Sequence, residues 1–172
     1  MITNQAKQIF AIFATGSPRR LTNINNAETG SGIGAANAAM YAFCGTQTQT
    51  PAQILTLSSN YCCLEIGYGD TPESASDYNL ADPDYLNTKL TCVAFGRSTI
   101  NTGDILHIYS HFKNNGGSNV TVREVGVFMN PSTSTSTGGN NVVLSFRKVL
   151  ESPVTIAPGE TYAFDYNVRF KS

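Results

Sequence analysis

The chain has no tryptophan, few charged residues and no long apolar run. Charged residues make up 13% of its 172 residues, about half the share found in an average globular protein. With 11 basic and 12 acidic residues the net charge is -1, so nothing predicts the positive surface that nucleic-acid binding requires. No run of about 18 apolar residues predicts a membrane span, and the apolar stretch at 9–14 is too short for a signal peptide. We expect a protein made in the cytoplasm that binds neither nucleic acid nor membranes.

Cysteine is also scarce. The four cysteines, Cys44, Cys62, Cys63 and Cys92, are too sparse for a secreted disulfide scaffold. They show no CxxC spacing, and the adjacent pair would point to opposite faces of a strand, so a zinc site has little support. We interpret the cysteines as buried thiols.

The only two histidines, His107 and His111, lie in the strand-like segment "ILHIYSHF". On a strand this spacing puts both side chains on one face but about 13 Å apart, too far to share a metal ion, and we interpret them as solvent-facing. The glycine-rich segment "GSGIGA" at 30–35 lacks the strand and helix that surround a dinucleotide loop. No serine or cysteine has the neighbours that activate a nucleophile. Outside the acidic segment, the sequence therefore predicts no enzymatic activity, no metal and no cofactor.

An acidic segment, "GDTPESASDYNLADPD", leaves more than one interpretation open. It contains Asp70, Glu73, Asp77, Asp82 and Asp84. We favour a solvated loop whose Asp and Ser side chains cap turns. Calcium binding is the alternative, although the EF-hand pattern is missing, and sequence alone does not give the carboxyl separation that glycoside hydrolysis requires.

Threonine, serine, asparagine and glycine supply most of the polarity, and they favour strands and turns. From residue 54 onward, strand-like segments recur between turn signals, with almost no amphipathic helix. The sequence predicts an all-β, antiparallel, jelly-roll-like sandwich of seven or eight strands over 54–172. Residues 1–53 read as an irregular N-terminal arm with one strand at 9–14 and a short helix at 35–43.

Individual segments give finer predictions. We expect "KNNGGSN" at 113–119 to close a hairpin, and "VVLSFRKVL" and "VTI" to form separate strands. The terminal strand alternates Tyr162, Phe164, Tyr166, Val168 and Phe170 with smaller or polar residues, which predicts five large side chains on the core face.

Three segments in fixed order carry a resemblance. "LEIGYGDTPESASDYNLADP" holds a strand, a G-x-G loop and a D-Y-x-L segment. "VREVGVFMN" is an R-E-x-G strand in which the glycine predicts a bulge or close approach. "VLESPVTIAPGETYAFDYNVRF" holds a strand, a PVT step, a PGET turn and an alternating terminal strand. Together they resemble β-rich structural proteins of tailed-bacteriophage virions, associated with capsid or tail. The residues that carry this resemblance are Gly67, Gly69, Asp77, Tyr78, Leu80, Arg123, Glu124, Gly126, Pro158 and Gly159.

The resemblance implies a non-enzymatic virion protein, foremost an auxiliary or decoration protein that binds the major capsid protein or other virion proteins as a homo-oligomer. A tail adaptor, fibre or receptor-binding module is one alternative. A carbohydrate-binding sandwich that uses the acidic segment, with Tyr68, Tyr78 and Tyr85 as aromatic platforms, is another.

Overall fold

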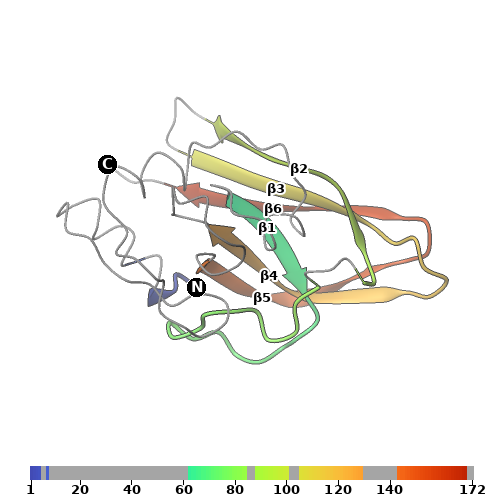
Figure 1. Cartoon of the computed structure of the whole chain (residues 1–172), viewed down its shortest axis with the longest axis horizontal. Helices are drawn as coiled ribbons and strands as arrows, with labels where there is room; N and C mark the ends of the chain where they lie inside the picture. Colours follow the sequence, from blue (N-terminus) through green and yellow to red (C-terminus); the bar gives the residue numbers. More distant parts are fainter. Residues whose placement is uncertain (5–6, 8–61, 85–87, 101–104, 130–142, 170–172) are drawn as a thin grey trace, which may run out of the picture.

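Six antiparallel strands form two three-stranded sheets that face each other (Figure 1). The computed structural model describes residues 1–4, 7, 62–84, 88–100, 105–129 and 143–169. One sheet has the order β1-β4-β5 and the other β2-β3-β6, which confirms the all-β antiparallel prediction. The strands are β1 (Cys62–Gly67), β2 (Thr91–Ile100), β3 (Ile105–Lys113), β4 (Val120–Met129), β5 (Val143–Ile156) and β6 (Thr161–Arg169). In this described part of the chain, no helix is long and apolar enough to cross a membrane.

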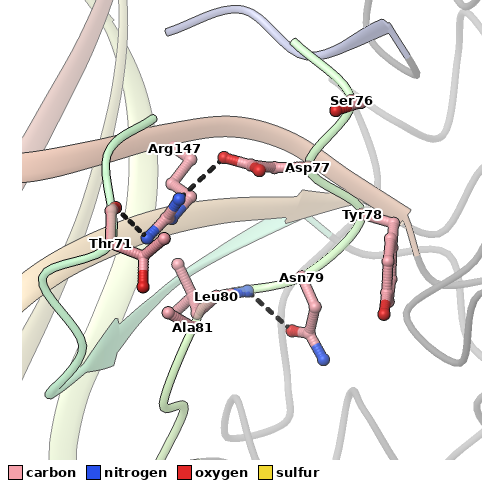
Figure 2. A pocket seen from close by; sticks show the side chains of 8 residues that line it. All are labelled: Thr71, Ser76, Asp77, Tyr78, Asn79, Leu80, Ala81 and Arg147. Atoms are coloured by element: carbon pink, nitrogen blue, oxygen red, sulfur yellow. Dashed lines mark hydrogen bonds and ion pairs between the residues drawn. The ribbon is translucent and has the colours of Figure 1, made fainter. Parts of the chain in front are cut away.

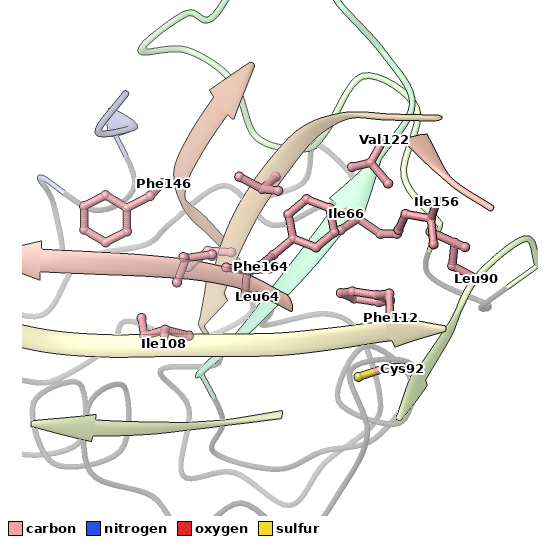
Figure 3. Packing of buried hydrophobic residues seen from close by; sticks show 13 residues of the cluster. Leu64, Ile66, Leu90, Cys92, Ile108, Phe112, Val122, Phe146, Ile156 and Phe164 are labelled. Carbon is pink, nitrogen blue, oxygen red and sulfur yellow. The ribbon is translucent and has the colours of Figure 1, made fainter. Parts of the chain in front are cut away.

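The core lies between the two sheets and consists of the apolar side chains that alternate along each strand (Figure 3). Leu64 and Ile66 of β1 face Ile108 and Phe112 of β3, and all four are fully buried. The Phe112 ring meets Phe164 of β6 edge-on at a centroid distance of 6.2 Å. Because the buried residues come from both sheets, the core holds the two layers together.

The glycine-rich segment after β3 crosses from one sheet to the other, so the predicted hairpin at 113–119 is wrong. β3 pairs with β2 and β6, whereas β4 pairs with β1 and β5. Asn114 is fully buried at this crossover, and its Nδ2 donates to Ile156 O at 2.9 Å and Ser118 O at 2.8 Å. A local turn signal does not reveal whether the next strand joins the same sheet.

The turn before β6 also crosses between the sheets. Glu160 N donates to Ala157 O at 3.1 Å, and Gly159 has φ of +81° after Pro158. Proline followed by a left-handed glycine is the signature of a type II turn. Gly159 N donates to Asn114 O at 2.8 Å, so the two crossovers support each other.

The segments predicted as two strands at 142–150 and 154–156 form one strand, β5, of 14 residues. Its pairing with β4 shifts between Val122 and Glu124, where residues 150–153 have no cross-strand partner on β4. This irregularity accommodates Pro153, whose missing N–H is tolerated at bulges and sheet edges.

The terminal strand is less buried than predicted. Phe164 is 6% exposed and Tyr166 is half-buried, but Tyr162 is 44% exposed. Among the described strands, β6 pairs only with β3, so it lies at a sheet edge, where side chains near the strand end reach solvent. Phe170 lies outside the described residues.

The first residues of the chain lie along β5. Ile2 forms an antiparallel bridge with Phe146, Thr3 N donates to Ser145 O at 3.1 Å, and Arg147 N donates to Met1 O at 3.0 Å. This contact covers part of an edge that would otherwise expose unpaired backbone groups. The predicted strand at 9–14, the predicted helix at 35–43 and the boundary at residue 53 lie outside the described residues.

Candidate functional site

Six of the ten residues that carry the resemblance meet around one buried carboxylate on the outer face of the β1-β4-β5 sheet. Glu124 of β4 is fully buried, and the segment that follows β1 folds back over it. The backbone N–H groups of Ala81 and Asp82 donate to its two oxygens at 3.1 and 2.9 Å. The six residues are Gly67, Gly69, Asp77, Leu80, Glu124 and Gly126.

Arg147 of β5 neutralises this carboxylate. Its Nε and Nη2 atoms both lie 2.8 Å from Glu124 Oε2, and Arg147 is only 2% exposed. The two residues come from neighbouring strands and share a face of the sheet. A buried ion pair of this kind is stable when hydrogen bonds satisfy the remaining atoms of both groups.

The other side of the guanidinium fixes residues 71–77. Nη1 donates to Asp77 Oδ2 at 2.7 Å, and Nη2 donates to Thr71 O at 2.9 Å (Figure 2). Burial alone would lower the pKa of Arg147, but its hydrogen bonds and charge interactions with Asp77 and Glu124 raise it above the ordinary value. Arg147 therefore stays charged and ties the loop to the sheet.

The G-x-G pattern exists because the backbone passes close to Glu124. A Cβ atom at Gly67 would lie 2.6 Å from Glu124 Oε1, and one at Gly69 would lie 2.5 Å from Ala81 Cβ. Both distances are shorter than normal contacts, so a side chain at either position would push the loop away from the carboxylate.

Gly126 shows the predicted close approach. A Cβ atom there would lie 2.8 Å from Leu144 Cδ1, 2.9 Å from Leu80 Cδ2 and 3.0 Å from Phe128 Cε2. These three apolar side chains form a small buried cluster beneath the loop. Leu80, the last position of the D-Y-x-L segment, thus anchors the loop over Gly126.

We expect Gly126→Ala to lower the free energy of unfolding by about 1–3 kcal/mol, the usual cost of overpacking. Gly117→Ala is the matched control, because nothing lies within 4 Å of the Cβ position at exposed Gly117. Urea denaturation followed by circular dichroism measures both. Equal stabilities of the two variants would contradict the close packing at Gly126.

Glu73 anchors the same loop to the edge of β5. Its Oε1 accepts from Val149 N at 2.8 Å, and its Oε2 lies 2.8 Å from the N-terminal ammonium of Met1. Burial acts to raise the pKa of Glu73, but these hydrogen bonds and the charges of the ammonium and Lys148 lower it overall.

Asp84 closes the far end of the loop. It is 2% exposed and accepts from Tyr68 Oη at 2.5 Å, Thr88 N at 2.8 Å and Leu90 N at 3.1 Å. The interpretation of this acidic segment as solvated is therefore right for exposed Asp82 but wrong for Asp84. Sequence does not distinguish the two, because burial depends on how the folded segment packs around each carboxyl group.

The capping role predicted for the segment is confirmed at Asp77, whose Oδ2 accepts from Ser74 N at 2.9 Å. Among the described residues, no group of three or more His, Cys, Asp or Glu side chains is placed to hold a metal ion.

Glu65 of β1 is a further buried carboxyl group. It is fully buried; its Oε1 accepts from Ile66 N at 3.0 Å, while its Oε2 has no hydrogen-bond partner. Burial and the charge of Asp84 raise the pKa of Glu65 and the Ile66 N–H lowers it, and the net result is a pKa of about 8.

Cys92 is a buried thiol, as predicted. Burial and the nearby Glu65 raise its pKa to about 12.

The remaining residues of the resemblance lie apart from Glu124. Tyr78 is exposed on the loop, Arg123 is half-buried on β4, and Pro158 and Gly159 form the turn before β6. Glu124 pairs with Arg147 rather than with the adjacent Arg123. The register of β4 and β5 shifts between Val122 and Glu124, so regular alternation does not apply at Arg123, and opposite faces for Arg123 and Glu124 stay a prediction.

The two histidines share a face of β3, as predicted, but both are half-buried. Tyr109 lies between them, with ring centroids 5.4 Å from His107 and 5.6 Å from His111. His107 Nε2 also lies 2.7 Å from Asp165 Oδ1. These contacts cover surface that the sequence pattern assigned to solvent.

The sequence patterns did not single out Arg147 or Glu65. Each is a charged residue inside an apolar strand, in "VVLSFRKVL" and "CCLEIG". A charged residue in such a position signals a buried partner or a buried polar site, because charged residues are rarely buried unless they are paired.

The sequence matches no protein-family model and no curated protein, and no solved structure matches the chain. Any functional conclusion therefore depends on the geometry above and on the resemblance of the three segments.

Proposed function

We propose that the chain is a non-enzymatic structural protein of tailed-phage virions, an auxiliary or decoration protein that binds the major capsid protein as a homo-oligomer. The jelly-roll-like arrangement of seven or eight strands is part of this proposal. The all-β, two-sheet fold supports it.

The observation that carries the proposal is the meeting of two separate segments of the resemblance around Glu124. Gly67, Gly69 and Leu80 come from the first segment, and Glu124 and Gly126 come from the second. These residues of the first two segments therefore form one physical unit, a loop fixed on the outer face of a sheet. Close packing requires each glycine in this unit. The residues taken together are therefore a more specific signal than each short motif alone.

The same unit suits a protein that docks on a large assembly. The guanidinium of Arg147 and the carboxylate of Glu73 tie the loop to β5, so little loop ordering remains when a partner binds. A preorganised surface loses less entropy on binding than a flexible one.

The test uses particles of a phage that encodes this chain. Mass spectrometry of gradient-purified virions should detect the chain, and particles from a deletion phage should bind the purified full-length chain on their heads. Absence of the chain from virions would overturn the proposal. Immunogold labelling on tails instead of heads would assign the tail-adaptor alternative and overturn the capsid assignment.

A further inference from the structure

An open hollow of about 360 Å³ lies beside the fixed loop (Figure 2). Thr71, Ser76, Asp77, Tyr78 and Asn79 line it with polar groups. Leu80, Ala81 and Arg147 complete the lining. The volume falls near the lower end of the range for small-molecule sites, about 300–1,000 Å³.

Hydrogen bonds hold several of the lining groups in place. Asp77 Oδ2 binds both Ser74 N and Arg147 Nη1. The Ser76 hydroxyl lies 2.8 Å from that of Ser74, and Asn79 Oδ1 accepts from Leu80 N at 2.8 Å. A ligand would therefore meet groups whose positions are already set, which favours binding.

Charge around the hollow selects against anions. Arg147 is its only cationic lining group in the described residues, and the guanidinium has five N–H groups. Those groups already make five contacts: two with Glu124 and one each with Asp77, Thr71 O and Pro72 O. An anionic ligand would meet the carboxylate of Asp77 without gaining a new donor from Arg147.

Tyr78 gives the hollow an aromatic wall. It is 37% exposed and lines the hollow. Tyr68, by contrast, donates its hydroxyl to Asp84 and carries Lys89 Nζ 3.9 Å from its ring centroid. Of these two tyrosines, Tyr78 is the one available as a platform.

We propose that this hollow binds a neutral carbohydrate, with the apolar face of a pyranose ring on Tyr78 and sugar hydroxyls bonded to Asp77 and Ser76. A sugar combines C–H faces with a ring of hydroxyls that both donate and accept hydrogen bonds, and the hollow offers an aromatic face, a carboxylate and a hydroxyl. The proposal concerns a binding site on the protein itself and does not depend on a place in a virion.

The experiment is saturation-transfer NMR on the full-length protein with methyl glucoside, methyl galactoside, methyl mannoside, maltose, lactose and cellobiose. N-acetylneuraminic acid serves as the anionic probe. We expect saturation of ring protons in at least one neutral sugar and no transfer to the anionic one. Tyr78→Ala should raise the dissociation constant of that sugar about tenfold or more, whereas Tyr78→Phe should retain most of the affinity.

Tyr162→Ala is the matched control, because Tyr162 is also an exposed tyrosine but lies on β6, outside the hollow. Its sugar affinity should equal that of the unmodified protein. Three results would each overturn the proposal: no binding of any neutral sugar in the panel, equal affinity of the Tyr78→Ala and Tyr162→Ala variants, or binding of the anionic sugar alone. Because the isolated protein is used, these outcomes are independent of the virion test.

Discussion

Replacing Arg147 by methionine is expected to lower the free energy of unfolding by about 3–5 kcal/mol, because the Glu124 carboxylate would remain buried without its counter-ion. Methionine keeps much of the apolar volume of the arginine stem, so most of the loss reflects the uncompensated charge. Urea denaturation followed by circular dichroism measures the effect.

The neighbouring residue supplies the control. Lys148 is 44% exposed and contacts Glu73 at 3.9 Å and Glu151 at 3.4 Å. Exposed ion pairs contribute little, so Lys148→Met should cost less than about 1 kcal/mol. If Arg147→Met cost no more than Lys148→Met, the buried pair would not stabilise the loop as described.

A double variant separates the effect of the unpaired Glu124 charge from the effect of the lost Arg147 packing. Adding Glu124→Gln to Arg147→Met removes the buried charge while leaving one side-chain oxygen to accept from Ala81 N or Asp82 N. We expect the double variant to be more stable than Arg147→Met alone, because the penalty of an unpaired buried charge disappears. Additive losses from the two changes would argue against direct coupling.

The second large effect is a dependence of stability on pH that Glu65 causes. The pKa of Glu65 is about 8 in the folded protein and 4.5 ordinarily. The folded state therefore holds a proton that the unfolded state releases between these values. The resulting stabilisation is complete below about pH 4.5 and is lost as the pH rises through 8. At about 1.4 kcal/mol for each pH unit, it amounts to at most roughly 5 kcal/mol.

Glu65→Gln should remove this dependence, because glutamine stays neutral throughout the range. Near pH 5 the variant and the unmodified protein should have similar stability, since the atom at the Oε2 position lacks a partner in either form. Near pH 9 the variant should be the more stable by several kcal/mol. The measurement is a series of urea denaturations from pH 5 to 9.

Glu151→Gln is the control for this series, because the Glu151 side chain is 90% exposed and its replacement should leave the pH profile unchanged. Since other groups also titrate, the difference between each variant and the unmodified protein isolates one carboxyl group. Parallel profiles for the Glu65→Gln variant and the unmodified protein would contradict a protonated Glu65 in the folded state.

The local pattern predicted most strand positions well. β4 matches the predicted segment "VTVREVGVFM" residue for residue, and β3 extends "ILHIYSHF" by one residue. The turn at Pro158 and Gly159 was also predictable, because the two residues have fixed backbone preferences. Such features depend on neighbours in the chain and can be recognised without the rest of the molecule.

The partners of each strand and each charge were not predictable in the same way. The segment at 113–119 has the composition of a hairpin turn but connects two sheets. Glu124 stands next to Arg123 in the sequence, yet it pairs with Arg147 of the adjacent strand. The pairing of β4 with β5, and not closeness in the sequence, decides which cation Glu124 meets.

The sequence by itself thus determined an all-β chain, most strand positions and the closing turn, because alternation and turn chemistry are local properties. Only the tertiary structure decided that the acidic loop is fixed over Glu124, that Glu65 and Asp84 are buried and that Tyr78 borders a hollow. Burial and charge pairing are set by residues far apart in the chain, and their free energies exist only when those residues meet.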